Sequence, residues 1–97
     1  MPTYITLLNW TQKGVENVKD APKRLDAAKK LYKAADAEIK AFYLVLGQYD
    51  AVVVSDAPND ETAARIALSV GRQGNVRTQT MRAFTEAEYR KLVRSVK

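Results

Sequence analysis

Seven residues have side chains that could together bind or act on a small molecule. They supply hydroxyl groups, one carboxylate and one guanidinium, at Tyr4, Thr6, Tyr43, Asp50, Thr78, Thr80 and Arg82. Hydroxyls exchange hydrogen bonds with carbonyl groups, and a guanidinium holds an oxyanion through paired N–H donors. The set predicts a site for a small, partly apolar molecule that carries an oxyanion or a carbonyl, with Arg82 as its anchor. The alternative is that the hydroxyls only hydrogen-bond across an interface and that Arg82 pairs with a carboxylate.

Asp50 is the candidate with two competing roles, because it follows the turn that begins at Gly47. Its carboxylate could act as a base, or it could orient an arginine: Arg24, Arg77 or Arg82. Alternatively, it caps the amides of the turn while Tyr49 packs on the edge of the sheet. Trp10 likewise could stack on a ligand or close the end of the sheet.

The absence of cysteine and histidine restricts the chemistry. It excludes disulfides, thiolate nucleophiles, Cys/His zinc sites and histidine bases. A general base near neutral pH would have to be a carboxylate with a raised pKa, a lysine or a tyrosine. No spacing places two carboxylates together on an inner face, which weakens the case for an enzyme without deciding it. No cofactor and no metal are expected.

The charge balance favours anionic partners without identifying one. Sixteen Lys and Arg residues against eleven Asp and Glu residues give a net charge of +5. Most of the basic residues fall on two helical stretches, where solvated helix faces account for them. Binding to nucleic acid is the less favoured alternative, through the segment 71–74, whose two glycines could approach phosphate, or through Lys23, Arg24, Lys30, Arg90, Lys91 and Arg94. The N-terminus lacks a signal-peptide pattern and no apolar run could span a bilayer, so we expect a cytoplasmic, soluble protein without membrane contact.

The order of elements indicates a single domain over residues 1–97. Alternating apolar residues predict strands over 3–9, 38–46, 51–55 and 75–84. Three- and four-residue spacings predict a helix from 12 to about 35 with a break at Pro22, a second over 60–70 and a short amphipathic one from 86. Thr11, Asn59 or Asp60, and Thr85 with Glu88 are the expected N-terminal caps.

The order β-α-β-β-α-β predicts an α+β, ferredoxin-like fold. Right-handed connections place both long helices on one face of a four-stranded antiparallel sheet. We expect that face to hold Ile5, Leu7, Leu44, Val52, Val54, Met81 and Ala83. The opposite face would carry Tyr4, Thr6, Leu8, Tyr43, Val45, Val53, Ser55, Thr78, Thr80 and Arg82. This second face is too apolar to remain in water, so we expect another copy of the chain to cover it. The C-terminal helix would at most shield an edge.

Short motifs along nearly the whole chain resemble the GYD family. They are Tyr4-x-Thr6, Thr11-x-x-Gly14, Pro22-x-Arg24, Gly47-x-Tyr49-Asp50, Ala57-Pro58-x-Asp60 and the segment 74–80. Gln48 and the glycine-free segment near Ala35 depart from the family pattern. The resemblance implies a dimeric α/β barrel, in which two ferredoxin-like sheets close around a cavity, and implies no established activity. The leading hypothesis is a small homo-oligomeric protein that binds a small organic molecule in an intersubunit cavity. The alternative, by analogy with other dimeric α/β barrels, is a cofactor-independent oxygenase or isomerase.

Overall fold

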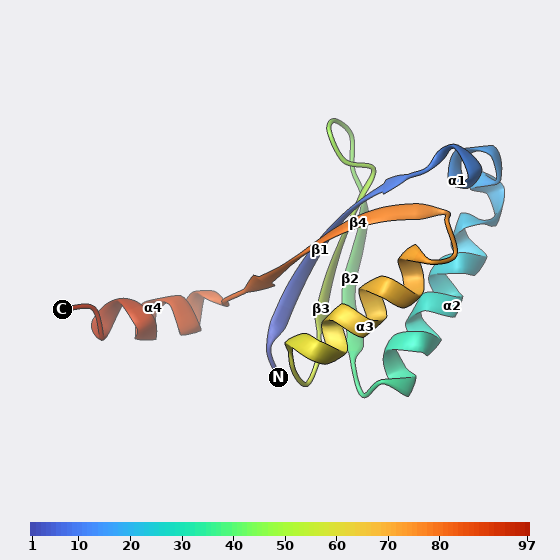
Figure 1. Cartoon of the computed structure of the whole chain (residues 1–97). Coiled ribbons are helices and arrows are strands. Elements are labelled where there is room, and N and C mark those ends of the chain that lie inside the picture. The colour runs from blue at the N-terminus through green and yellow to red at the C-terminus, as the bar shows by residue number, and fades with distance from the viewer.

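The computed structural model describes all residues from 1 to 97, and its centre is a four-stranded sheet (Figure 1). The strands are β1 (Thr3–Trp10), β2 (Glu38–Leu44), β3 (Ala51–Asp56) and β4 (Val76–Ala83). Their order across the sheet is β2-β3-β1-β4, and every neighbouring pair is antiparallel. The α+β, ferredoxin-like fold expected from the element order is therefore confirmed.

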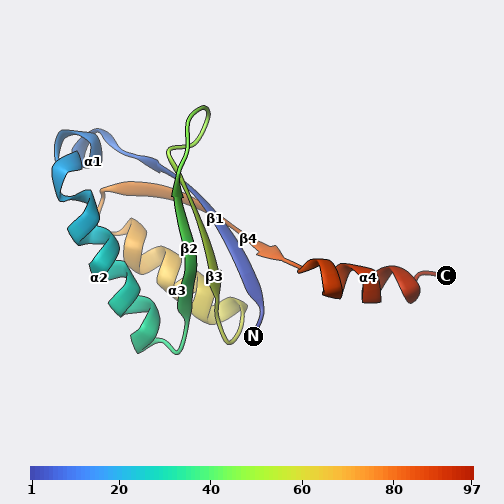
Figure 2. The same ribbon diagram turned by 180° about the vertical axis from the view of Figure 1, so that it is seen from behind.

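The helices form a second layer and one projecting element. They are α1 (Gln12–Glu16), the short 3-10 helix η1 (Val18–Asp20), α2 (Ala21–Ala34), α3 (Asp60–Gly71) and α4 (Glu86–Arg94). Figures 1 and 2 show α2 and α3 on the same side of the sheet, as right-handed connections require. The break expected near Pro22 is present, because η1 separates α1 from α2. No helix of the chain combines the length and the apolarity needed to cross a bilayer.

Side-chain caps begin three of the helices, as expected. Thr11 accepts a hydrogen bond from the Gly14 N–H, and Asn59 accepts one from the Thr62 N–H. Thr85 and Glu88 form a reciprocal capping box at the start of α4. Such caps satisfy backbone donors that a helix cannot pair internally, and each typically stabilises a helix by about 1 kcal/mol.

The two faces of the sheet are reversed from the sequence-based assignment. Tyr4, Thr6, Leu8 and Val53 point toward α2 and α3, where the sequence placed Ile5, Leu7, Val52 and Val54. The prediction was wrong because both alternating sets are apolar, so hydrophobicity does not say which set the helices cover. In β1, hydrophobicity favours Ile5 and Leu7 as the residues that face the helices, because Thr6 in the other set is less apolar.

We call the side away from the helices the open face. Cross-strand pairing places seven apolar residues on it: Ile5, Leu7, Ala41, Tyr43, Val52, Val54 and Met81. Tyr43 is 60% exposed and Met81 39% exposed, and no element of the chain covers them. The expectation of one uncovered, largely apolar face is thus met, although by the other set of side chains.

A register shift in β2 also changes which of its side chains face the helices. The pairing with β3 is irregular between Ile39 and Ala41, so the strict two-residue alternation fails there. Ile39 and Phe42 consequently both lie on the helix face, although they are three residues apart. A bulge of this kind inserts one unpaired residue and carries no clear hydrophobic signal.

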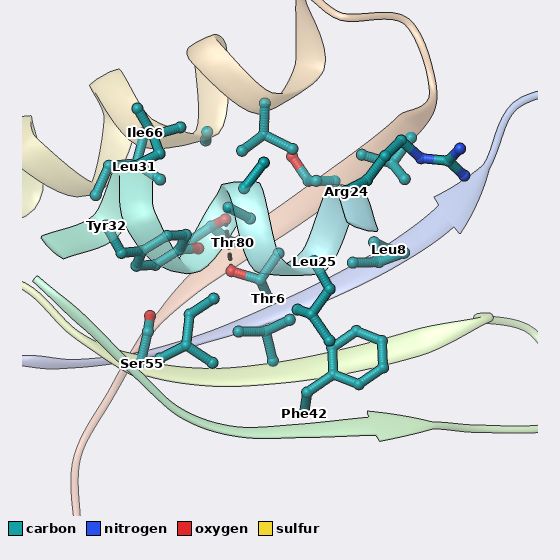
Figure 3. Close-up of a pocket in the computed structure, with 18 of the residues that line it drawn as sticks. Thr6, Leu8, Arg24, Leu25, Leu31, Tyr32, Phe42, Ser55, Ile66 and Thr80 are labelled. Carbon is teal, nitrogen blue, oxygen red and sulfur yellow. Dashed lines mark hydrogen bonds between the residues drawn. The ribbon is translucent and has the colours of Figure 1, made fainter. Parts of the chain in front are cut away.

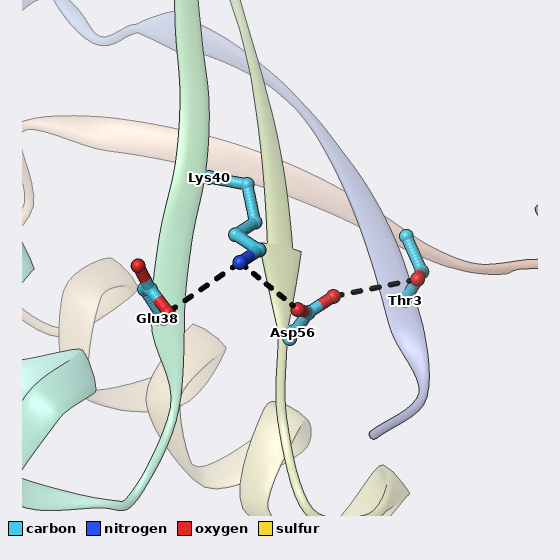
Figure 4. A network of polar contacts seen from close by, with 4 residues as sticks. All are labelled: Thr3, Glu38, Lys40 and Asp56. Atoms are coloured by element: carbon cyan, nitrogen blue, oxygen red, sulfur yellow. Dashed lines mark hydrogen bonds and ion pairs between the residues drawn. The ribbon is translucent and has the colours of Figure 1, made fainter.

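One end of the open face is polar. Lys40 lies 3.6 Å from Glu38 and 3.8 Å from Asp56, and the Thr3 hydroxyl donates to Asp56 over 3.4 Å (Figure 4). Ion pairs this exposed contribute at most about 1 kcal/mol each. The network therefore marks the boundary of the apolar open face more than it stabilises the fold.

Candidate functional site

A cavity of about 210 Å³ lies between the helix face of the sheet and the two helices α2 and α3 (Figure 3). Most of its lining is aliphatic or aromatic, and no aspartate or glutamate lines it. Small side chains on the helices, such as Ala28 and Ala63, leave this space open, because they cannot reach across the gap to the sheet. A concave, mainly apolar site with a few polar groups is typical of small-molecule binding.

The polar part of the cavity is a group of hydroxyls on the sheet side. Thr6 and Thr80 are cross-strand partners, and their hydroxyl oxygens are 3.0 Å apart. Ser55 from β3 and Tyr32 from α2 bring two further hydroxyls to the same region (Figure 3). We call Thr6, Tyr32, Ser55 and Thr80 the hydroxyl cluster. It can donate and accept hydrogen bonds while carrying no charge.

Both tyrosines that line the cavity remain protonated at neutral pH. Burial raises the pKa of Tyr32, and the neighbouring hydroxyls of Ser55 and Thr6 only partly offset this rise. Burial, the hydrogen bond to Asp60 and the charge of Asp60 together raise the pKa of Tyr4 to about 12. A phenol with a raised pKa donates hydrogen bonds but is a poor proton acceptor near pH 7.

Tyr4 also anchors the start of α3. Its hydroxyl donates to the Asp60 carboxylate over 2.5 Å, and its side chain is only 3% exposed. Asp60 is the first residue of α3, where a negative charge is favoured by the unpaired N–H groups of the first turn. One face of Tyr4 therefore borders the cavity while its hydroxyl fixes the helix that closes the cavity.

Four of the seven candidate residues come together at this cavity: Tyr4, Thr6, Thr78 and Thr80. They lie on the neighbouring strands β1 and β4, and their side chains point to the same face of the sheet, as the sequence pattern predicted. The structure corrects the position of the cavity, however. The sequence-based hypothesis placed it between two subunits, whereas these side chains face the helices of their own chain.

Arg82 lies outside the main cavity. Its guanidinium stacks 4.5 Å from the Phe84 ring and 5.9 Å from the Tyr4 ring, and it donates to the carbonyl of Ala83. It lines a separate, more open depression beside Tyr4 and Asp60. Arg82 is thus not placed to anchor a ligand inside the cavity.

Tyr43 and Asp50 are also away from the cavity. Tyr43 is on the open face. The Asp50 carboxylate accepts a hydrogen bond from the Trp10 N–H over 3.0 Å, and the Asp50 N–H donates to the Leu8 carbonyl over 2.9 Å. The capping alternative therefore describes Asp50, although the amide that it caps belongs to the end of β1.

The polar cavity residues outside the seven candidates are Tyr32, Arg24, Ser55, Gln73 and Asn75. Tyr32 follows Ala28 by four residues in α2, a spacing typical of a buried apolar helix side, and only its phenol could have indicated a polar role. Arg24 borders the cavity and donates to the carbonyls of Asn17 and Gly14 over 3.0 and 3.3 Å. Its signal was its spacing of three and four residues from Ala21 and Ala28, on a helix side where a basic residue is uncommon.

Comparisons with known proteins agree with this architecture. The family model of the GYD domain matches residues 4–93. A curated relative from Thermus thermophilus, the glutamine synthetase and cystathionine beta-lyase binding protein, is 35% identical over 89 residues, which cover 91% of this chain and 94% of the relative.

Solved structures share the fold at low sequence identity. The leucine response regulatory protein of Mycobacterium tuberculosis is 15% identical with a TM-score of 0.65, over 87% of this chain and 51% of that one. The feast or famine regulatory protein of M. tuberculosis, solved with L-methionine, has a TM-score of 0.66 at 15% identity, and the match covers 88% of this chain and 51% of that one. A Thermus thermophilus protein has a TM-score of 0.56 at 21% identity, and the match covers 88% of this chain and 95% of that one. This chain spans about half the length of the two regulatory proteins. These likenesses show the fold.

Proposed function

The chain belongs to the GYD domain family, and from that premise we propose that it is a small homo-oligomeric protein that binds a neutral organic molecule in the cavity beneath α2 and α3. The observation that carries the proposal is the hydroxyl cluster within a mainly apolar cavity. Such a cavity rewards a ligand that is mostly hydrophobic and has one group able to hydrogen-bond.

The size and charge of the cavity define the ligand class. An apolar cavity of about 150 Å³ holds benzene. At about 210 Å³, this cavity has room for a single aromatic ring with one hydroxyl or carbonyl substituent. Arg82 lies outside the cavity, no carboxylate lines it, and the Arg24 guanidinium at its border already donates to the carbonyls of Asn17 and Gly14. A fully charged group would therefore lose its hydration without gaining a free partner of opposite charge.

The homo-oligomer is supported by the surface that the single chain exposes. Its accessible surface is 7026 Å², whereas the scaling for compact monomers of 10.8 kDa gives about 5,500 Å². The open face contributes apolar side chains to that surface. A second copy placed on this face, most simply by a two-fold axis, would bury it and produce a dimeric α/β barrel.

The enzyme alternative, a cofactor-independent oxygenase or isomerase, gains less support. Proton abstraction from a bound molecule needs a base in the cavity. The only titratable groups placed there besides Arg24 are Tyr4 and Tyr32, whose pKa values are both raised. Their chemistry suits recognition through hydrogen bonds.

The ligand proposal is tested with p-cresol and phenol as neutral probes and benzoate as the charged probe. We expect p-cresol to raise the melting temperature and benzoate to have a smaller effect. Thr6→Val removes one hydroxyl from the cluster at nearly constant volume, and a lost hydrogen bond of about 1 kcal/mol weakens binding roughly fivefold. Thr3→Val makes the same change on β1 but on the open face, so it is the matched control. No stabilisation by either neutral probe at millimolar concentration, or equal effects of the two variants, contradicts the proposal.

A second candidate function is binding to metabolic enzymes. It is favoured by the Thermus thermophilus relative, which is named for binding glutamine synthetase and cystathionine beta-lyase and aligns over nearly the whole of both chains. Sedimentation of this protein mixed with each purified enzyme tests it. A fast-moving complex would support this function, and unchanged boundaries with both enzymes would oppose it.

A further inference from the structure

We propose that the C-terminal arm, residues 84–97, is exchanged between two copies of this chain and packs its apolar side on the partner. The proposal rests on the homo-oligomer proposed above and is independent of the ligand. It assigns an interaction surface to a helix that has no part in the cavity.

The arm leaves the body of its own chain. Figures 1 and 2 show α4 projecting beyond the end of β4, away from the sheet and from both long helices. The apolar residues of the arm are consequently exposed by between 48% and 75%, at Tyr89, Leu92 and Val93 on α4 and at Val96 just beyond it. The expectation that this helix shields an edge of the sheet was wrong, because β4 ends at Ala83 and the chain continues outward.

The exposed residues form one continuous stripe. Positions 89, 92 and 93 follow the three- and four-residue steps that align side chains along one side of a helix, and Val96 continues this spacing two residues beyond the end of α4. The opposite side carries Lys91 and Arg94. Glu86 and Arg90, at the border of the stripe, form an ion pair over 2.9 Å. Phe84, 54% exposed, adds a further apolar side chain where the arm begins. The arm is therefore amphipathic, with an apolar side that nothing in its own chain covers.

The local sequence of the arm specifies a helix that cannot be stable alone. Thr85 and Glu88 form the capping box, acidic residues occupy the first turn and basic residues the last. Hydrogen bonds at the Thr85 backbone and side chain lower the pKa of Glu88 and keep it charged in the cap. Even so, an isolated helix of nine residues is marginal in water. Helical order in the arm requires that its apolar stripe be packed against another surface.

The excess exposed surface is as large as one partner's share of an obligate dimer interface. The accessible surface exceeds the compact-monomer value by about 1,500 Å², nearly twice the roughly 800 Å² that a standard interface buries on each partner and within the range of about 1,000–2,500 Å² for obligate homodimers. The radius of gyration agrees: it is 14.6 Å, against about 12.5 Å for a compact chain of this length. The chain thus has the dimensions of a subunit with an extended element.

A second copy is the occupant that satisfies both exposed apolar surfaces. The open face and the arm are continuous, because Met81 on that face lies on β4 just before the arm begins. A two-fold axis that brings two open faces together carries each arm to the other chain, so that both arms are covered at once. The stripe offers no charge to a phosphate backbone, which makes nucleic acid an unsuitable partner for it.

Hydrogen exchange of the α4 amides, measured alongside sedimentation, tests the exchange of arms. We expect the amides of α4 to exchange at least about tenfold more slowly in the dimer than after dilution to monomer, since only packing protects them. Leu92→Glu puts a charge on the stripe, and Lys91→Gln lowers the net charge by the same amount outside the stripe. Leu92→Glu should weaken the dimer at least about tenfold and remove the protection, whereas Lys91→Gln should do neither.

The outcomes separate this inference from the proposed function. A dimer whose α4 amides exchange at the unprotected rate contradicts the proposed exchange of arms and leaves a dimer formed through the open face. Protected α4 amides in a monomer show that the arm folds back on its own chain, which also contradicts the exchange of arms. A monomer with unprotected α4 amides contradicts both the arm and the homo-oligomer. Equal effects of the two variants would likewise contradict the role of the stripe.

Discussion

Gly14 is the position where a single added methyl group should damage the fold most. A Cβ atom there would lie 2.0 Å from the carbonyl oxygen of Asn75 and 3.3 Å from the Cβ of Trp10. The approach is this close because Thr11 holds the start of α1 against the loop before β4. The Thr11 N–H donates to the Asn75 carbonyl over 3.0 Å, and the Thr11 hydroxyl donates to the Gly74 carbonyl over 2.6 Å.

In Gly14→Ala, either α1 or the loop must move by more than an ångström. That movement breaks the two hydrogen bonds of Thr11, each worth about 0.5–1.5 kcal/mol, and the residual crowding costs about 1–3 kcal/mol. Alanine recovers about 1 kcal/mol through its better helix propensity. We therefore expect the free energy of unfolding to fall by about 2–4 kcal/mol, which lowers Tm by at least about 8 °C in a domain of this size.

Urea unfolding at a fixed chain concentration measures this change, since oligomers unfold in a concentration-dependent way. Far-UV circular dichroism is the main signal, with fluorescence of the single tryptophan as a second. Gly71→Ala is the control, because nothing lies within 4 Å of its added Cβ. It should leave stability unchanged or raise it by up to about 1 kcal/mol. A Gly14→Ala protein as stable as the control would refute the close approach.

Two other substitutions test polar contacts of the site. Because the folded chain holds the Tyr4 proton to about pH 12 and the unfolded chain releases it near pH 10, wild-type stability should decline as pH rises from 10 to 12. A pKa difference of two units limits the part of the decline that is due to Tyr4 to about 2.7 kcal/mol. Urea unfolding at pH 9 and pH 12 should show this part in the wild type and not in Tyr4→Phe. Equal declines in the two proteins would contradict the raised pKa of Tyr4. Asp50→Ala should lower the free energy of unfolding by about 1–2 kcal/mol because the Trp10 N–H loses its acceptor, while Asp50→Asn keeps an acceptor and most of the stability. If Asp50→Asn were as unstable as Asp50→Ala, the carboxylate charge would matter more than the hydrogen bond.

Local features of the fold could be predicted because they depend on neighbours in the sequence. A cap needs only a residue and the N–H group two or three positions later, so the caps at Thr11, Asn59 and Thr85 followed from the sequence. Element order and the ferredoxin-like arrangement followed from periodicity and the handedness of connections.

The face covered by the helices could not be predicted in the same way. The odd-numbered and even-numbered residues of β1 are both largely apolar, and the register shift in β2 interrupts the alternation of its side chains between the two faces. Alternation and pairing still grouped Tyr4, Thr6, Thr78 and Thr80 correctly, because residues of equal parity on adjacent strands share a side. Their partner Tyr32 depends on how α2 packs on the sheet, which is a tertiary property without a local signal.

The position of β1 in the sheet also affects how the chain folds during synthesis. β1 is made first, yet it lies between β3 and β4, and the residue that pairs with Thr6 on β4 comes 74 positions later. Nascent β1 can pair with β3 once residue 56 has emerged, but its edge toward β4 stays unpaired until nearly the entire polypeptide has left the ribosome. Such distant pairings fold slowly and expose strands that can associate wrongly. For this protein, the period before β4 emerges is when misassembly through the free edge of β1 is most favoured.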